Sequence, residues 1–448
     1  MSSVQNQVQD AIDQLVESGA ETGVQVAAYQ RGELVVDAVA GLADPATGRQ
    51  VTSDTPFYAT STGKGATSTV AHVLAERGVL SYDTRIVELW PEFGAHGKET
   101  TTIRHVLTHS AGVPGLPVDT TPEDLTDWQK MCDAIADAEP WWEPGTKTGY
   151  HAQTYGYLVG EIVRRITGKR ISQVLREDVA GPLGVANELF FGVPESELGR
   201  LARLDEAEAP DEMPAEMPAE MPDIPFFRVV NGYTAAPMAA MPNAEFGNRA
   251  DILTADIPSG GTMTARAIAR MYAALMGEVD GVRLVSPERF REITAVAITG
   301  VDEVVGFPTT RALGYDLGLP GPLDSPTVFG MAGSGGTAAY ADTASGQANY
   351  GSAAGRFNAW GLGCQHFMDH PGGDRLVDGG GFTAIGHLGD AWGLIGTFAF
   401  NRETKDGLIF LCGGTGFDPR TRPGIYSSFF RFEERILTAL YQRALRTA

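Results

Sequence analysis

The fold of this chain is constrained most by the order of its secondary-structure patterns: strands come first, helices lie in the middle and strands come last. Near the N-terminus, VQVAAYQ (24–30) and ELVVDAVAGLAD (33–44) flank an Arg-Gly pair, which predicts a β-hairpin. The last third carries short apolar runs and Gly-rich turns, and LIGTFAFNRETKDGLIFLCGG (394–414) is its clearest hairpin. The order predicts an α/β (α+β) fold of two lobes, with the helical middle inserted into a split α/β lobe.

Amphipathic helices are expected at both ends of the chain. Val4, Val8, Ile12 and Leu15 recur on one face of an opening helix, and residues 427–448 form a closing one. We therefore predict a single unit spanning 1–448. Residues 1–60 and about 310–448 form its α/β lobe, and residues from about 61 to 309 form its helical lobe.

An acidic, proline-rich stretch interrupts the helical lobe. Residues 206–225, EAEAPDEMPAEMPAEMPDIP, repeat the unit AEMP and offer few apolar side chains for a core. An extended, exposed insertion is the simplest interpretation. The functional alternative is a segment that docks a partner or closes over a site.

Composition excludes several classes of function. The 448 residues are 43% hydrophobic with a formal net charge of −22, so the surface repels nucleic acids and anionic membranes. Three scattered cysteines fit neither a disulfide framework nor a zinc cluster. No leader-like segment and no apolar run of membrane-spanning length is seen, and we expect a cytoplasmic protein.

Chemistry is first suggested by YATSTGKGAT (58–67), which places Ser61 and Lys64 three residues apart at a predicted helix start. A bare S-x-x-K is usually only a polar helix cap. A serine nucleophile needs a neighbour that accepts its proton. Lysine can do so when its pKa is lowered, which burial and the positive end of a helix both favour. Tyr150, in the loop before another helix, is a candidate third member.

Five ordered motifs carry a family resemblance. They are FYATSTGKGAT (57–67), IRHVLTHSAGVPGL (103–116), PGTKTGYHAQTYGYLVGEIVRRITGK (144–169), EDVAGPLGV (177–185) and PSGGTMTARAIARMYAAL (258–275). In this order they resemble the serine β-lactamase and penicillin-binding-protein superfamily, in particular its β-lactamase-like carboxylesterase branch, related to class C β-lactamases. The resemblance implies a central antiparallel sheet flanked by N- and C-terminal helices. It also implies that Ser61 is acylated, that Lys64 accepts or relays its proton, and that Tyr150 is a second base.

One departure from the family pattern bears on the substrate. The family usually has Tyr-x-Asn, but this chain has Tyr150, His151 and Ala152, and alanine cannot hydrogen-bond a substrate amide. Hydrolysis of small carboxylic esters (EC 3.1.1) is therefore favoured. The alternatives are an amidase or peptidase, a weak β-lactamase, an acyltransferase and, from another class, a non-catalytic binding relative.

The family's last motif occurs twice. It lies on a strand beside the serine, where a backbone N–H helps to bind the oxyanion. His387 and Gly389 form one copy, which a following hairpin and helix favour as closure of the sheet. Met331, Gly333 and Ser334 form the other, which continuity with the preceding helix favours. We prefer His387 and Gly389.

The remaining signals concern the pocket and possible ligands. Trp141, Trp142 and His151 flank the tyrosine motif and are candidates for the substrate pocket. The histidines and aspartates of HFMDHPGGD (366–374) fit a surface loop better than a metal site, and no metal or cofactor is expected. The expected partner is a small-molecule ester, and no oligomeric state is predicted.

Overall fold

A nine-stranded antiparallel sheet organises the part of the chain that the structure describes. The structure is a computed structural model that describes residues 3–19, 21–205, 225–318, 327–343, 347–354, 382–387 and 397–401. The strand order is β10-β11-β12-β13-β14-β15-β1-β2-β3, so N-terminal strands lie beside strands from the last third of the chain. In that order the strands span Ile298–Val301, Pro308–Arg311, Asp316–Leu317, Val328–Gly333, Thr337–Asp342, Gln347–Ala354, Gly23–Gln30, Glu33–Asp44 and Arg49–Gln50.

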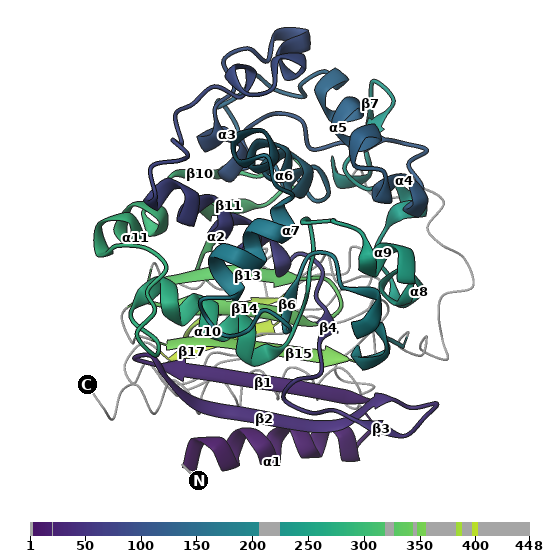
Figure 1. Cartoon of the computed structure of the whole chain (residues 1–448), viewed down its shortest axis with the longest axis vertical. Coiled ribbons are helices and arrows are strands. Elements are labelled where there is room, and N and C mark those ends of the chain that lie inside the picture. Colours follow the sequence, from purple (N-terminus) through teal and green to yellow (C-terminus); the bar gives the residue numbers. More distant parts are fainter. Residues whose placement is uncertain are drawn as a thin grey trace.

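The N-terminal hairpin and its helix are confirmed. β1 and β2 pair around Arg31 and Gly32, both of which have positive φ (50° and 83°). Successive β1 side chains face opposite sides of the sheet. Val24 and Val26 pack with α1 (Ser3–Glu17), whereas Tyr29 belongs to the main core. Helix α1 therefore covers one face of the hairpin, at the end of the molecule opposite α3 and α5 (Figure 1).

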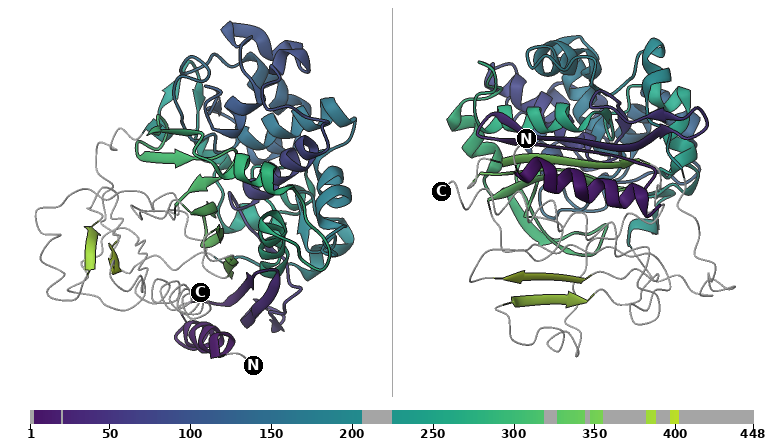
Figure 2. Two further views of the ribbon diagram at one scale, coloured as in Figure 1. Left: turned by 90° about the vertical axis from the view of Figure 1, so that its left-hand side faces the viewer. Right: turned by 90° about the horizontal axis from the view of Figure 1, so that it is seen from below.

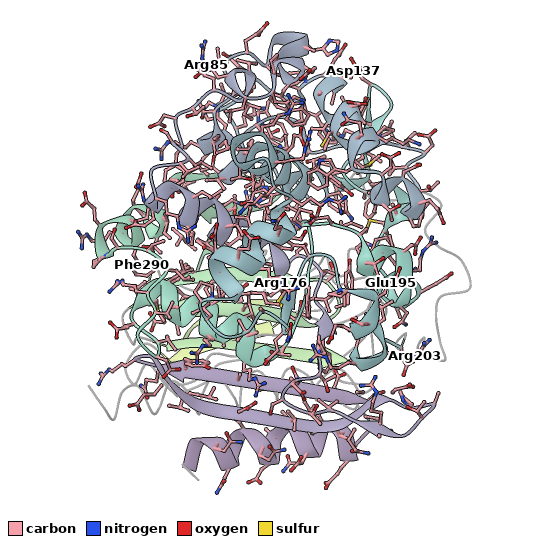
Figure 3. The ribbon with its side chains drawn as sticks, viewed as in Figure 1. Arg85, Asp137, Arg176, Glu195, Arg203 and Phe290 are labelled. Carbon is pink, nitrogen blue, oxygen red and sulfur yellow. The ribbon has the colours of Figure 1, made fainter. Side chains whose placement is uncertain are left out.

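The helical lobe packs around one long buried helix. Helix α2 (Gly63–Glu76) is buried over all but its last residue and contacts α6 (Thr154–Thr167). Side chains are densely distributed through this part of the molecule (Figure 3). The other helices of this lobe are α3 (Ile103–Leu107), α4 (Pro122–Thr126), α5 (Trp128–Asp137), α7 (Ile171–Val174), α8 (Ala244–Asn248) and α9 (Ala250–Thr254).

The predicted helical lobe, which extends to about residue 309, includes a helix that packs on the sheet. Helix α10 (Ala265–Met276) packs on β1, β14 and β15, on the sheet face away from α1. Apolar side chains at helical spacing give α10 one wide buried face, which the sheet covers. Helix α10 thus belongs with the sheet, and the short helix α11 (Pro287–Thr294) packs against it.

Three small sheets complete the described part. One joins β4 (Phe57–Tyr58), β9 (Thr262–Met263) and β6 (Leu189–Phe190), and another joins β5 (Leu116–Pro117), β8 (Tyr233–Thr234) and β7 (Val229–Val230). The third pairs β16 (Phe382–His387) with β17 (Thr397–Asn401), drawn in yellow-green in Figure 2.

Several expectations fall wholly or partly outside the described residues. They are all but the last residue of the acidic insertion, the second strand of the 394–414 hairpin, the 366–374 segment and the closing helix. Among the helices that are described, none combines the length and apolarity needed to cross a bilayer.

Candidate active site

Ser61 lies in the turn that connects β4 to helix α2. The helix begins at Gly63, so Ser61 precedes it by two residues instead of occupying its first turn as the sequence suggested. A Cβ atom at Gly63 would lie 2.1 Å from the Gly260 carbonyl oxygen, which leaves no space for a side chain. The 258–261 segment therefore presses directly on the serine turn.

Two other side chains meet at the Ser61 hydroxyl. Tyr150 donates its phenolic O–H to Ser61 Oγ at 2.6 Å, and Lys64 Nζ donates to the same oxygen at 3.0 Å. Lys64 Nζ also donates to the Ser259 carbonyl oxygen at 2.7 Å. The structure thus brings together the three residues that the sequence singled out.

Burial determines the protonation states of Lys64 and Tyr150. The Lys64 side chain has almost no exposure to solvent, and this burial lowers its pKa from 10.5 to about 7, although the Asp316 carboxylate opposes the shift. Burial raises the pKa of the Tyr150 phenol, and the hydrogen bond to Ser61 only partly offsets this effect. At neutral pH the phenol is protonated and a substantial fraction of the lysine is a free amine, so Lys64 can act as the base.

The Tyr150 loop is held by two buried histidines. The His151 N–H donates to His109 Nδ1 at 3.0 Å, and the His109 ring stacks on Tyr155. His109 follows α3 instead of continuing it and has φ of 56°, so it does not share a helix face with His105.

His151 itself is a correction to the predicted pocket. It is fully buried, with Nδ1 donating to the Gly149 carbonyl oxygen at 2.6 Å and Nε2 accepting from the Val113 N–H at 3.2 Å. Both ring nitrogens are used by the backbone. The side chain therefore shapes the loop and does not line a pocket.

Apolar side chains surround the tyrosine. Trp142 is buried and donates its indole N–H to the Ser110 carbonyl oxygen at 3.3 Å, whereas Trp141 is only partly buried. The cluster around them contains Tyr150 and Ala152 and includes residues that sequence reasoning missed: Phe226, Phe227, Met241, Val304 and Val305. Their aromatic and aliphatic character was visible, but their distance along the chain hid their proximity.

One copy of the last motif lies against the serine turn. Thr60 Oγ1 donates to the Ser334 carbonyl oxygen at 2.7 Å, and the Thr62 and Thr337 hydroxyls are 2.8 Å apart. A Cβ atom at Gly333 would lie 2.7 Å from Thr60 Oγ1, so the β13 backbone closely approaches this turn.

Of the two copies, the one that the sequence favoured less lies beside Ser61 in the described residues. It is on β13, with Met331 buried in that strand. His387 ends β16 in a separate sheet, and Gly389 lies outside the described residues.

A cluster of charged side chains around the buried Arg311, close to the Tyr150 backbone, was also missed. Arg311 donates from Nη2 to Asp302 at 2.8 Å and from Nε to Asp316 at 3.1 Å. Asp302 and Arg311 belong to no recognisable motif, and the sequence signal was limited to their polarity in strand-like segments. In the described residues, no group of three or more His, Cys, Asp or Glu side chains is arranged to hold a metal ion.

Comparison with known proteins agrees with the geometry. The family model Beta-lactamase matches residues 8–425. Esterase/beta-lactamase LipL of Mycobacterium tuberculosis is 35% identical over 330 residues, which cover 73% of this chain and 75% of that protein. A family VIII carboxylesterase structure superposes with a TM-score of 0.69 at 32% identity, covering 84% of this chain and 96% of the other. The structure of a penicillin-binding protein homologue from Caulobacter crescentus superposes with a TM-score of 0.68 at 32% identity. The match covers 79% of this chain and 92% of the other.

Proposed function

The chain belongs to the Beta-lactamase family, and from this premise we propose that it hydrolyses small carboxylic esters through an acyl-enzyme on Ser61. One observation carries the proposal: Lys64 Nζ and the Tyr150 hydroxyl both contact Ser61 Oγ. A serine flanked by a depressed-pKa amine and a neutral phenol has a proton acceptor and a proton donor within hydrogen-bond reach.

In the acylation step, neutral Lys64 takes the Ser61 proton as Oγ attacks the ester carbonyl carbon. The bond to the alcohol oxygen then breaks, and Tyr150 gives its proton to the departing alkoxide while the Lys64 ammonium re-protonates the phenol. In deacylation a water molecule attacks the acyl carbon and gives a proton to the Lys64–Tyr150 pair, which passes a proton to Ser61 Oγ as the acyl–oxygen bond breaks. The net reaction consumes one water and releases an acid and an alcohol.

The oxyanion needs two N–H donors. We assign one to the backbone N–H of Ser61, which lies in the turn just before helix α2. We assign the other to Ser334, because Thr60 and Thr62 hold the end of β13 and the turn after it against the serine turn. His387 and Gly389 remain the alternative, and Gly389 lies outside the described residues.

The wall beside Tyr150 supports an ester as substrate. Ala152 and the partly buried Trp141, Phe227 and Met241 offer apolar contacts and no side-chain amide to hydrogen-bond a substrate amide. An amidase or peptidase, a weak β-lactamase and an acyltransferase would use the same three residues. Comparing an ester with its amide analogue, a penicillin and an added alcohol acceptor separates these activities.

Intact-protein mass spectrometry tests the proposal. The protein and its Ser61→Ala variant are exposed briefly to p-nitrophenyl esters of increasing acyl length, and turnover is followed in parallel. We expect an acyl adduct and turnover only with Ser61 present. Full activity of Ser61→Ala would reject the mechanism, and absence of labelling by a fluorophosphonate would favour a non-catalytic binding relative.

A further inference from the structure

A carboxylate outside the three reacting residues contacts the backbone of Tyr150. The Tyr150 N–H donates to Asp302 Oδ1 at 3.0 Å, across 152 positions of sequence. Resting on the proposed function, we infer that Asp302 is a positioning residue, which fixes the Tyr150 backbone so that the phenol reaches Ser61.

Asp302 is itself held without freedom to rotate. Its Oδ1 also accepts the N–H groups of Val304 and Val305, each at 2.9 Å, and its Oδ2 accepts from Arg311 Nη2 at 2.8 Å. The side chain has 0% exposure to solvent. A buried carboxylate with four donors in place acts as a rigid anchor, because any rotation would leave a buried polar group unpaired.

Arg311 extends the anchor to the start of the Tyr150 loop. Its Nη1 donates to Thr148 Oγ1 at 2.7 Å, and that hydroxyl donates to the Thr108 carbonyl oxygen at 3.0 Å. The Glu303 N–H donates to the Thr148 carbonyl oxygen at 2.9 Å. Residues 302–311 thus hold the loop at Thr148 and again at Tyr150.

The opposite side of the loop is fixed by the 108–110 segment. The Gly149 N–H donates to the His109 carbonyl oxygen at 2.9 Å, and the next residue donates to Asp302. Two successive N–H groups therefore have fixed partners on separate segments, which defines the peptide plane from which the Tyr150 side chain projects. Catalytic geometry is sensitive to shifts of about 1 Å, so loss of one partner should slow acylation without removing any reacting group.

A competing role is that Asp302 only neutralises Arg311, which is buried with 4% side-chain exposure. The two roles make different predictions. Neutralisation is restored when both charges are removed together, as in Asp302→Ala combined with Arg311→Met. Positioning is not restored, because the acceptor of the Tyr150 N–H is still missing.

A double-mutant cycle on the full chain tests the inference. We expect Asp302→Ala to lower kcat by roughly 10- to 100-fold with little change in KM. Combined with Tyr150→Phe, it should cost less than about twofold beyond Tyr150→Phe alone, because Asp302 acts through the phenol. Multiplicative losses, or recovery of kcat in Asp302→Ala/Arg311→Met, would overturn the positioning role.

A matched control separates positioning from general loss of stability. Glu161 is also a fully buried carboxylate, paired with Arg164 and Arg165 on α6. Glu161→Ala should lower the melting temperature as Asp302→Ala does, yet keep kcat within about twofold when assayed well below the melting temperature. An equal loss of kcat in both variants would assign the Asp302 effect to folding. Full activity of Tyr150→Phe alone would contradict the proposed function and not only the positioning role of Asp302. The double-mutant cycle includes this single variant, so the two failures are distinguishable.

Discussion

Lys64 Nζ lies over the ring of Tyr150, 5.2 Å from its centroid, while both side chains reach the same serine oxygen. An ammonium in this position is stabilised by the face of the ring and by the Ser259 carbonyl oxygen. The acid form of Lys64 that follows deprotonation of Ser61 therefore has partners already in place. Charge can form there without rearrangement of the site.

Substituting Lys64 by arginine tests its role as a base. A guanidinium stays protonated at all working pH values and cannot accept the Ser61 proton. We expect Lys64→Arg to lower kcat/KM for a p-nitrophenyl ester by at least about 1,000-fold, in the range of a lost general base. A conventional initial-rate assay suffices, with Lys130→Arg on the exposed side of α5 as the matched control. Retention of more than a tenth of the activity would show that another group takes the proton.

The pH profile should show an acidic limb near neutrality. Lys64 must be unprotonated to act, and its pKa is about 7, so kcat/KM rises as pH increases through about 7. The raised pKa of Tyr150 keeps the phenol protonated over the same range. The measured midpoint belongs to the coupled pair.

Substitution of Asp316 tests whether Lys64 controls the acidic limb of the pH profile. Its carboxylate raises the pKa of Lys64, so Asp316→Asn should move the acidic limb to lower pH. Stopped assays from pH 5 to 9 would reveal the displacement. A limb that stays in place or moves to higher pH would mean that another group controls it.

Buried histidines should make folding sensitive to acid. Burial lowers the pKa of His72 to about 3 and that of His151 to about 4, below the ordinary 6.5. Below pH 6.5 the unfolded chain therefore binds more protons than the folded one, and the free energy of unfolding falls as pH decreases. At pH 4 each of these two histidines lowers the free energy of unfolding by roughly 3 kcal/mol relative to neutral pH.

Urea titrations at pH 7.5, 5.5 and 4.5 would measure this loss. His151→Gln removes one of the protonation sites, so its stability should depend less steeply on pH than that of the parent protein. A stability that is constant from pH 7.5 to 4.5 would contradict the assignment.

Ala152 can be changed to test the preference for esters. Asparagine at this position supplies an amide that can hydrogen-bond the amide of a substrate, which alanine cannot. We expect Ala152→Asn to raise the ratio of amide to ester hydrolysis by roughly tenfold, the value of one useful hydrogen bond. Ala152→Ser, which adds a smaller polar group, is the control. An unchanged ratio would place the discrimination in the apolar wall.

The three side chains that meet at the Ser61 hydroxyl could be predicted from the sequence because their signals are local. Ser61 and Lys64 are three positions apart, and Tyr150 lies within a recognisable loop-to-helix motif. The N-terminal hairpin was equally accessible, since Arg31 and Gly32 mark its turn. Each of these inferences needs only neighbours along the chain.

The features of the fold and the site that the sequence did not predict depend on which distant segments of the chain pack together. The hydrogen bond between Tyr150 and Asp302 spans 152 residues, and no local pattern encodes it. The choice of β13 beside the serine follows from strand order, which two copies of a short motif could not decide. The left-handed backbone at His109, which ends the run of α3, leaves no local signal in the sequence.

Residues from both sides of the 206–224 segment meet around the group formed by Ser61, Lys64 and Tyr150. Ser61, Lys64 and Tyr150 precede it, whereas Ser259, Asp302 and Ser334 follow it. Neither half of the chain holds a complete set of these groups. Two polypeptides divided within this segment would each be inert alone, and ester turnover by their mixture would report directly that the halves had reassembled.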